Sequence, residues 1–375
     1  MQDFYIFAKN FHINKAIIRR DGYIYQSLIA FFMTGTGNSY TVARWCAQVA
    51  ETTGIGSQLV QIKAGEKRGA VPSRSLAVFT YPTHGFTAPW LIMKYIWCLP
   101  NGRNLHAIVL PTRAGIRIKG AFFPGLEGTA GYLIAFLLWL RGYHVQGVMG
   151  VDMPSNWTAL HWGLSKQNAA VIIEMAQSKV KGMLQTVLAG NKHYDGMVQL
   201  LVGIALAKVS LMYLIMAQFI LAKLFFASDK CNGCSLCQSI CPKKALKMVG
   251  RQGRPYWTFS CDSCMACMNY CPQKAIEVSP FIITLFYYIA TVPVFAYAMS
   301  YAAGGDALQW GISLGLGFGI QYGYTLAAIA LAYGLLHVAL GSRIIRAIAA
   351  KLSHTHYFRR YQASNVSLKD IHLHK

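Results

Sequence analysis

The sequence is short of acidic residues and of charged residues in general. Its 375 residues include only 13 Asp and Glu against 35 Lys and Arg, and charged residues make up 13% of the chain. Apolar residues reach 54%, so the chain has ample apolar surface to bury and is not expected to be disordered. The net charge of +22 indicates anionic partners, which admits nucleic acid, an anionic membrane surface or acidic proteins.

Motifs of several common function classes are also missing. The sequence has no zinc-finger, homeodomain or RNA-binding pattern, and its basic residues are spread along the chain, so we expect no nucleic-acid partner. It has no Gly-rich nicotinamide loop, no Ser/His/Asp arrangement and no zinc-hydrolase motif, so no catalytic residue is predicted. Residues 1–24 lack the apolar core and cleavage site of a secretory signal and are expected to be an extension.

Eight of the ten cysteines fall into two runs with identical spacing. Each run reads Cys-x-x-Cys-x-x-Cys-x-x-x-Cys-Pro, the bacterial-type spacing for [4Fe–4S] clusters, in which the last Cys ligates the other cluster. The predicted ligands are Cys231, Cys234, Cys237 and Cys271 for one cluster, and Cys261, Cys264, Cys267 and Cys241 for the other. The rival interpretations are zinc, which needs four ligands with different spacing, and disulfides, which are rare in the cytosol.

Residues 228–280, which contain both runs, resemble a dicluster bacterial ferredoxin. The resemblance implies a small α+β domain with two clusters within electron-hopping distance. Small soluble ferredoxins are typically acidic, whereas this segment is basic, which favours an acidic partner or an anionic membrane. The basic residues are Lys230, Lys243, Lys244, Lys247, Arg251, Arg254 and Lys274. Cys46 and Cys98 lie outside the runs and are expected to be ordinary buried residues.

A loop rich in Gly and Thr lies upstream of the cysteines. Residues 27–33 form a continuous apolar run that predicts a buried parallel strand, and a helical pattern through Val42, Trp45 and Val49 follows the loop. A strand, such a loop and a helix N-terminus together form a phosphate-binding geometry. The loop residues are Thr34, Gly35, Thr36, Gly37, Asn38 and Ser39. No Lys follows them, which excludes a nucleotide-hydrolysing P-loop.

Two further loops are predicted to lie beside this one. Residues 76–81 and 105–110 predict strands, a fifth strand is expected at 146–151, and the apolar helix 131–139 is expected to be deeply buried or pressed on a membrane. The first strand leads into Pro82, Thr83, His84, Gly85 and Phe86. The second leads into Pro111, Thr112, Arg113, Ala114 and Gly115. Loops at the carboxyl ends of such strands meet where doubly wound sheets bind their ligands.

These features make residues 25–195 similar to the flavodoxin family. The resemblance implies an α/β doubly wound parallel sheet that binds FMN. It assigns the phosphate to residues 34–39 and places residues 82–86 and 112–115 beside the isoalloxazine. By its charge, Arg113 would favour the anionic reduced flavin if it faces the ring, and the opposite orientation is the alternative.

Two uncharged tracts near the C-terminus, at 281–303 and 308–340, are each long enough to span a bilayer. They predict a transmembrane helical hairpin at 281–341, with a buried helical pair as the alternative. The following tail, 342–375, is basic and is expected on the cytoplasmic side. Its basic residues next to the hairpin are Arg343, Arg346, Lys351, Arg359 and Arg360.

The apolar connector 196–227 is interpreted as a helix in the membrane interface or docked on the hairpin. Lys208 and Lys223 would then snorkel to the membrane surface. A genuine membrane span of this segment is left open.

The order of the parts resembles flavodoxin–ferredoxin fusion proteins, with a membrane anchor added. The sequence thus predicts a protein of the inner membrane that passes electrons between FMN, two [4Fe–4S] clusters and a redox partner, with its cofactor domains on the cytoplasmic side. Expected partners are an acidic soluble redox protein such as ferredoxin, the lipid membrane, and a quinone or an integral membrane oxidoreductase. The alternatives are a reductase of a lipophilic substrate (quinone, isoprenoid or pigment) and a relay subunit of a larger membrane redox complex.

Overall fold

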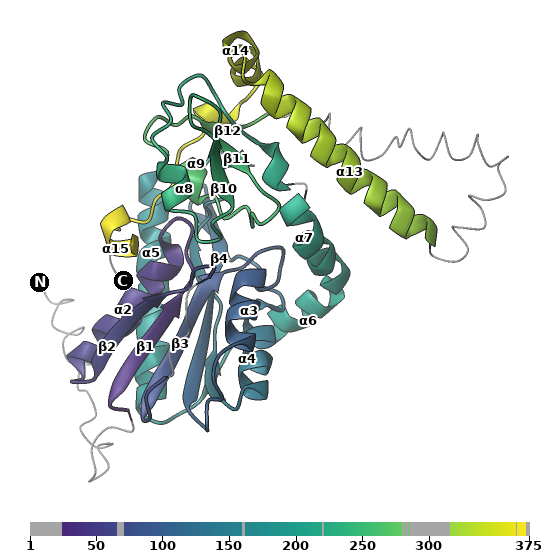
Figure 1. The fold of residues 1–375 in the computed structure, drawn as a ribbon. Helices are drawn as coiled ribbons and strands as arrows, with labels where there is room; N and C mark the ends of the chain where they lie inside the picture. Colours follow the sequence, from purple (N-terminus) through teal and green to yellow (C-terminus); the bar gives the residue numbers. More distant parts are fainter. Residues whose placement is uncertain are drawn as a thin grey trace, which may run out of the picture.

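The chain forms a sheet domain, a small domain over one end of the sheet, and helices that project from them (Figure 1). The computed structural model describes residues 25–65, 71–159, 162–219, 221–279, 282, 284, 316–364 and 366–372.

The central sheet has the strand order β2-β1-β3-β4-β6-β8, and neighbouring strands in that order are parallel. The strands are β1 (Ser27–Phe32), β2 (Gly56–Gln61), β3 (Ser75–Pro82), β4 (His106–Ile118), β6 (His144–Val148) and β8 (His193–Tyr194). This is the 2-1-3-4-5 order of flavodoxin-like doubly wound sheets, extended by one short strand. The strands predicted at 27–33, 76–81 and 105–110 are confirmed, because continuous apolar runs suit strands that are covered on both faces.

Helices cover both faces of the sheet, as Figure 1 shows. Strand β1 divides its side chains between two cores, with Leu28 and Phe32 on one face and Ile29 and Phe31 on the other. The first core is closed by α2 and α5, and the second by α3 and α4. The helix bounds are α2 (Asn38–Thr52), α3 (Trp90–Trp97), α4 (Ala130–Leu140) and α5 (Lys166–Leu188).

Helix α4 buries only one of its sides. Ile134 and Leu138 pack in the sheet core, whereas Phe136 and Trp139 are exposed. The predicted deep burial of residues 131–139 is therefore wrong for the outer side of the helix. Contact of that side with a membrane stays a prediction.

Strand β4 continues beyond its predicted end. Its residues 112–115 pair in parallel with β7 (Val151–Pro154), and its last residues pair with the antiparallel β5 (Ala121–Phe123). The prediction that residues 111–115 form a loop is therefore wrong, because the backbone of β7 holds them extended. The predicted fifth strand is divided between β6 and β7.

The small domain contains two antiparallel strand pairs and repeats its backbone. Ser235 and Met265 take left-handed φ angles of 59° and 62°, and Lys244 and Lys274 take φ angles of 51° and 49°. The paired strands are β9 (Phe225–Ala227) with β12 (Ile276–Val278), and β10 (Leu246–Val249) with β11 (Arg254–Trp257). The short helices are α8 (Leu236–Ser239) and α9 (Ala266–Tyr270). Because β9 belongs to this domain, the domain begins inside the predicted connector.

The connector forms α6 (Met197–Ala205) and α7 (Ala207–Phe219), followed by the 3₁₀ turn η2 (Leu221–Leu224). The two helices meet at a bend of 72°. Lys208 is exposed, but Lys223 is completely buried, so its predicted snorkelling is wrong. Its ammonium donates to the carbonyl of Trp257 inside the small domain.

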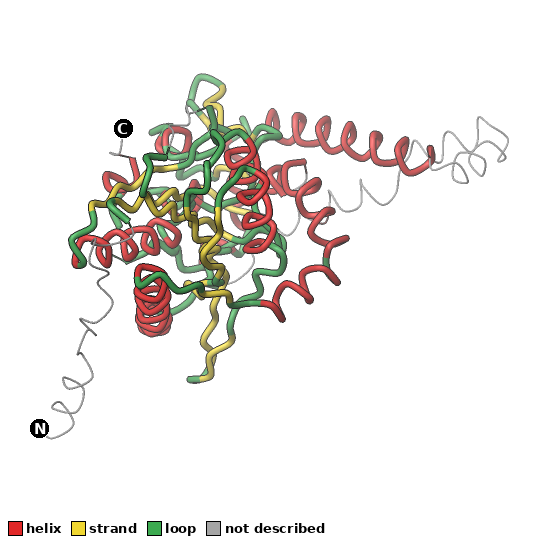
Figure 2. The backbone as a smooth tube through the Cα atoms, turned by 90° about the horizontal axis from the view of Figure 1, so that it is seen from below, coloured by secondary structure: helices red, strands yellow, loops and turns green. Residues whose placement is uncertain are grey.

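Helix α13 (Leu316–Ala339) extends outward on the side of α6 and α7, and α14 (Arg343–Lys351) follows it after a sharp bend (Figure 1). Figure 2 shows a long helix projecting away from the rest of the chain. Of the predicted first hairpin arm, 281–303, the structure describes only 282 and 284. Within the described part of the chain, no single helix has both the length and the apolar character to cross a membrane. The pairs α6 with α7 and α13 with α14 meet that criterion only as bent units.

The C-terminal residues run from α14 back to the sheet domain. Arg346 is buried and donates hydrogen bonds of 2.7 Å to the carbonyls of Leu340 and Gly341, at the end of α13. Arg360 donates to the carbonyl of Ile276. Two of the five basic residues predicted to flank a membrane span are therefore engaged within the protein. The chain ends its described part in α15 (Leu368–His372).

Candidate functional site

One set of four cysteines surrounds a small cavity at the surface of the small domain. These residues, here called the outer site, are Cys231, Cys234, Cys237 and Cys271. Burial, together with the neighbouring thiolates of Cys231 and Cys271, raises the pKa of Cys237 to about 12. Thiols with such pKa values stay protonated unless a positively charged group binds them, which is what the iron of a cluster does.

The second set, here called the inner site, consists of Cys241, Cys261, Cys264 and Cys267. Burial raises the pKa of Cys264, and the nearby thiolates of Cys241 and Cys261 raise it further. The last cysteine of each run therefore lies with the first three cysteines of the other run. This is the crossed ligand arrangement that suits two [4Fe–4S] clusters.

The repeat also supplies matching hydrogen bonds to sulfur. The backbone N–H groups of Ala245 and Ala275 each donate to the sulfur of the cysteine four residues earlier, at 3.3 Å. Ser263 N–H donates to the Cys261 sulfur at 3.4 Å. Such bonds stabilise negative charge on the sulfurs and raise the reduction potential of a cluster. Each copy of the Cys-Pro-x-Lys-Ala repeat thus supplies a cysteine and the backbone N–H group that donates to its sulfur.

The two sites differ in depth. Cys234 of the outer site is exposed, whereas Cys261 and Cys267 of the inner site are buried. The inner site lies against the carboxyl-end edge of the sheet, where a methyl group added at Gly35 would overlap the backbone oxygen of Cys264. The small domain is therefore held to the sheet domain through the loop of an inner-site ligand.

A buried lysine stands beside the inner site. Lys223 has no exposed surface, and its ammonium donates to the carbonyl of Trp257. It lies 4.1 Å from the ring centre of Phe259 and 4.4 Å from that of Tyr333, as cation–π contacts. Burial lowers the pKa of Lys223 to about 8, while the Cys261 thiolate acts in the opposite direction. Among the described residues no carboxylate pairs with it, and the inner-site residue Cys261 is the anionic group that acts on its pKa.

The predicted phosphate loop, residues 34–39, is covered by other parts of the chain. Its hydroxyl groups already have protein partners: Thr34 Oγ1 accepts from Gly37 N–H at 3.0 Å, Thr36 Oγ1 accepts from Asn156 at 2.6 Å, and the Ser39 hydroxyl bonds to that of Thr112 at 3.1 Å. These groups are buried and bonded to the protein, so they do not face a ligand.

The C-terminal segment lies directly on this loop. Ala363 N–H donates to the Thr36 carbonyl at 2.9 Å, and the Tyr361 hydroxyl donates to Asn38 Oδ1 at 2.6 Å. A methyl group added at Gly37 would lie 2.8 Å from the Cβ of Ala363. In this arrangement of the chain the loop residues do not fit an FMN phosphate. Binding of FMN therefore stays a prediction.

The second predicted flavin loop is covered by α7. A methyl group added at Gly85 would overlap the ring of Tyr213, whose centre lies 6.4 Å from that of His84. Burial lowers the pKa of His84, which favours its neutral form. Phe86 takes a left-handed φ of 62°, and its carbonyl accepts from Thr129 N–H at 2.9 Å. Pro82 ends β3, and the N–H of Thr83 donates to the Thr112 carbonyl at 2.8 Å.

Arg113 is paired rather than free. Its guanidinium makes two hydrogen bonds of 2.8 Å to the Asp152 carboxylate and one to Glu127. The two carboxylates offset its charge, and an effect of Arg113 on a flavin stays a prediction. Ala114 and Gly115 lie beside it within β4, paired to Met153 and Pro154.

Sequence reasoning missed several residues of this region. Lys223 and Tyr213 lie in the apolar connector, which reads as membrane-associated, and only the contacts of the folded chain reveal their position beside the inner site. The partners of Arg113, Glu127 and Asp152, are buried acids, and their burial is visible only in the folded chain. Cys46 is buried as predicted, but Cys98 is exposed at the end of α3, contrary to the prediction.

Comparison with known proteins gives one family match. Residues 223–278 match the model of a 4Fe-4S dicluster domain, which includes strand β9. A search of curated proteins finds no match to the sequence.

Solved structures give distant similarities. A flavodoxin from the domain Archaea is 13% identical with a TM-score of 0.28, and flavodoxin 1 from Bacillus cereus is 14% identical with a TM-score of 0.29. Each covers 41% of this chain, and the similarity spans 99% and 96% of those proteins. The regulatory domain of the biofilm regulator CsgD is 11% identical with a TM-score of 0.23, over 49% of this chain and 98% of its own. At these values the strand order, rather than the similarities, establishes the flavodoxin-like fold.

The chain thus joins a flavodoxin-like sheet domain to an iron–sulfur domain of ferredoxin type. This combination is that of an electron-transfer protein.

Proposed function

We propose that this chain carries electrons through two [4Fe–4S] clusters, between a docked acidic redox protein and an acceptor at a membrane. The observation that carries the proposal is the unequal depth of the two cysteine sets, because it gives the relay a solvent end and a buried end. Each cluster would supply one-electron redox chemistry through its iron. The protein holds both sites in one repeated backbone and shields the inner site from water.

The basic surface around the outer site supports an acidic partner. Lys230, Lys247, Arg251 and Lys274 are exposed on the small domain. Their charge attracts an acidic protein and orients it with the outer site facing it, which speeds association at low ionic strength. Electrons would then enter or leave the protein through the outer site.

Exposed apolar residues support attachment to a membrane. On α6, Val198 and Leu201 are exposed, and on α14, Ile344 and Ile348 are exposed beside Arg343. A helix with apolar residues on one side and basic residues at its edge lies well in the interface of an anionic bilayer. The proposed location is the cytoplasmic face of the inner membrane, with the predicted hairpin at 281–341 as the anchor.

Single cysteine variants test the two-cluster assignment in anaerobically purified full-length protein. The wild type is expected to hold about eight iron atoms per chain. Cys234→Ser and Cys264→Ser should each lose about half of the iron and a different part of the EPR spectrum. Cys98→Ser, an exposed cysteine outside both sites, is the matched control and should change neither.

The direction of the relay is tested in the same variants. A reduced acidic ferredoxin should reduce the inner cluster of Cys98→Ser rapidly and that of Cys234→Ser slowly, whereas a small chemical reductant should reduce both. Equal rates with ferredoxin would contradict entry through the outer site. Iron content that is unaffected by Cys264→Ser would contradict the inner site.

A further inference from the structure

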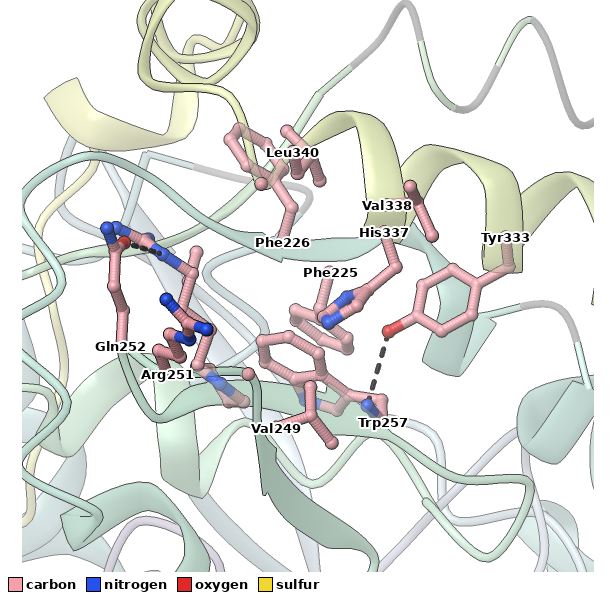
Figure 3. A pocket seen from close by; sticks show the side chains of 15 residues that line it. Phe225, Phe226, Val249, Arg251, Gln252, Trp257, Tyr333, His337, Val338 and Leu340 are labelled. Atoms are coloured by element: carbon pink, nitrogen blue, oxygen red, sulfur yellow. Dashed lines mark hydrogen bonds between the residues drawn. The ribbon is translucent and has the colours of Figure 1, made fainter.

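A cavity of about 460 Å³ lies between the small domain and α13. Figure 3 shows its aromatic wall, formed by Phe225, Trp257 and Tyr333. Its volume is in the range of pockets that bind small organic molecules. No residue that lines it belongs to either cysteine set, so it is a site of its own.

The cavity reaches the inner site through one side chain. Trp257 lines the cavity and also packs with Cys261 and Cys267 in the buried core of the small domain. Its position is fixed, because its backbone N–H donates to the Tyr333 hydroxyl at 3.2 Å and its carbonyl accepts from Lys223. A molecule in the cavity would therefore be separated from an inner-site ligand by one indole ring.

Polar groups of the cavity are arranged around the aromatic wall. Figure 3 shows the imidazole of His337 pointing toward Phe225 and Trp257, and Arg251 and Gln252 lying across the cavity from it. Among the described residues His337 makes ring contacts with Tyr256 and Tyr333 but no hydrogen bond, so its ring nitrogens remain available. Polar donors at separated positions on an aromatic cavity suit a flat ring that carries two oxygen acceptors.

One side of the cavity continues into an apolar surface. Val338 lines the cavity and is 78% exposed, and Leu331 and Leu335 are exposed on the same helix. An apolar chain attached to a ring in the cavity would lie along α13. The bound molecule therefore has a polar aromatic head and an apolar tail.

We infer that this cavity binds the head group of a lipophilic quinone and that the inner site reduces it there. Two electrons, delivered one at a time from two molecules of reduced donor protein, and two protons from water convert the two quinone carbonyls into hydroxyl groups. His337 is the positioning residue that donates to one carbonyl oxygen. The electron source rests on the function proposed above, whereas the binding of the quinone does not.

Binding is tested on the oxidised full-length protein in detergent, with decylubiquinone as the ligand and an azido-quinone as the photo-crosslinking probe. The crosslink should fall within residues 249–257 or 333–341. His337→Leu should weaken binding about tenfold, as expected for the loss of one buried hydrogen bond. Val338→Trp, which fills the mouth of the cavity, should weaken binding at least as much.

Met175→Trp is the control, since it adds the same side chain at an exposed position of α5, outside the cavity and away from the apolar surface of α13. It should leave the affinity unchanged. Crosslinks elsewhere, or equal losses for Met175→Trp and Val338→Trp, would overturn the inference.

Two outcomes separate quinone binding in the cavity from electron transfer through the clusters. Quinone binding in a protein whose clusters are not reduced by ferredoxin would uphold the cavity and overturn the relay. Reduction of the clusters without quinone binding would do the reverse.

Discussion

Gly35 packs its α-carbon against the backbone carbonyl of Cys264, so a side chain there would overlap a loop that carries an inner-site ligand. Gly85 meets the ring of Tyr213 in the same way. Both glycines are therefore required where the sheet domain contacts the parts of the chain that cover it. Lys223 acts through its charge instead. A buried cation beside anionic thiolates stabilises added negative charge.

Gly35→Ala is expected to lower the free energy of unfolding by about 1–3 kcal/mol, because backbone must move to admit the methyl group. Thermal unfolding under anaerobic conditions measures the effect. Gly182→Ala is the control, since Gly182 lies in the middle of α5 with nothing near its added methyl, and it should be neutral or slightly stabilising. Equal stability of the two variants would contradict the packing of Gly35 on Cys264.

Lys223→Met is expected to lower the reduction potential of the inner cluster, because it removes a buried positive charge next to it. A shift of about 60 mV corresponds to a tenfold change in the ratio of reduced to oxidised cluster. EPR-monitored redox titration measures the potential. Lys208→Met, an exposed lysine of the same connector, should leave the potential unchanged, and a potential unaffected by Lys223→Met would refute the electrostatic role.

At the scale of elements, the strands were predictable where their pattern is local. The apolar runs of β1 and β3 are continuous, and burial on both faces explains them. The second half of β4 was not predictable, because its extended form depends on pairing with β7, about forty residues later in the chain. The grouping of the eight cysteines into two crossed sets was predictable from their spacing, whereas the cover over residues 34–39 depends on contacts with the C-terminal segment. The corner between α13 and α14 depends on hydrogen bonds from the buried side chain of Arg346, which the sequence does not distinguish from the exposed Arg343.

Arg346→Met is expected to destabilise that corner by about 2 kcal/mol, because it removes charged hydrogen bonds to the carbonyls of Leu340 and Gly341. Amide hydrogen exchange around residues 338–346 should accelerate. Arg343→Met, an exposed arginine at the start of α14, is the control and should leave exchange unchanged. The same exchange rates in both variants would show that Arg346 does not hold the corner.

At the scale of the whole molecule, the chain folds back on itself. The small domain and the C-terminal segment both lie on the carboxyl-end edge of the sheet, which is where doubly wound sheets bind ligands. The sheet domain thus uses its ligand-binding edge to hold its own iron–sulfur domain. Any phosphate ligand of residues 34–39 would have to compete with Tyr361 and Ala363 for this loop.

Deletion of residues 361–375 is expected to uncover the loop. Amide exchange at residues 34–39 should accelerate, and added FMN should bind the shortened chain more tightly than the full chain, as measured by quenching of flavin fluorescence. Tyr361→Phe removes only the hydrogen bond to Asn38 and should have a smaller effect. Equal FMN affinity of the full and shortened chains would show that the segment is not the barrier to flavin binding.

The unequal depth of the two sites has a practical consequence for handling the protein. Oxygen reaches an exposed cluster before a buried one. Air should therefore destroy the outer cluster first, while the buried inner cluster remains intact. Protein prepared aerobically would then retain about four iron atoms per chain, a content easily mistaken for that of a single-cluster protein. The outer cluster would thus be lost before the inner cluster, which adjoins the cavity.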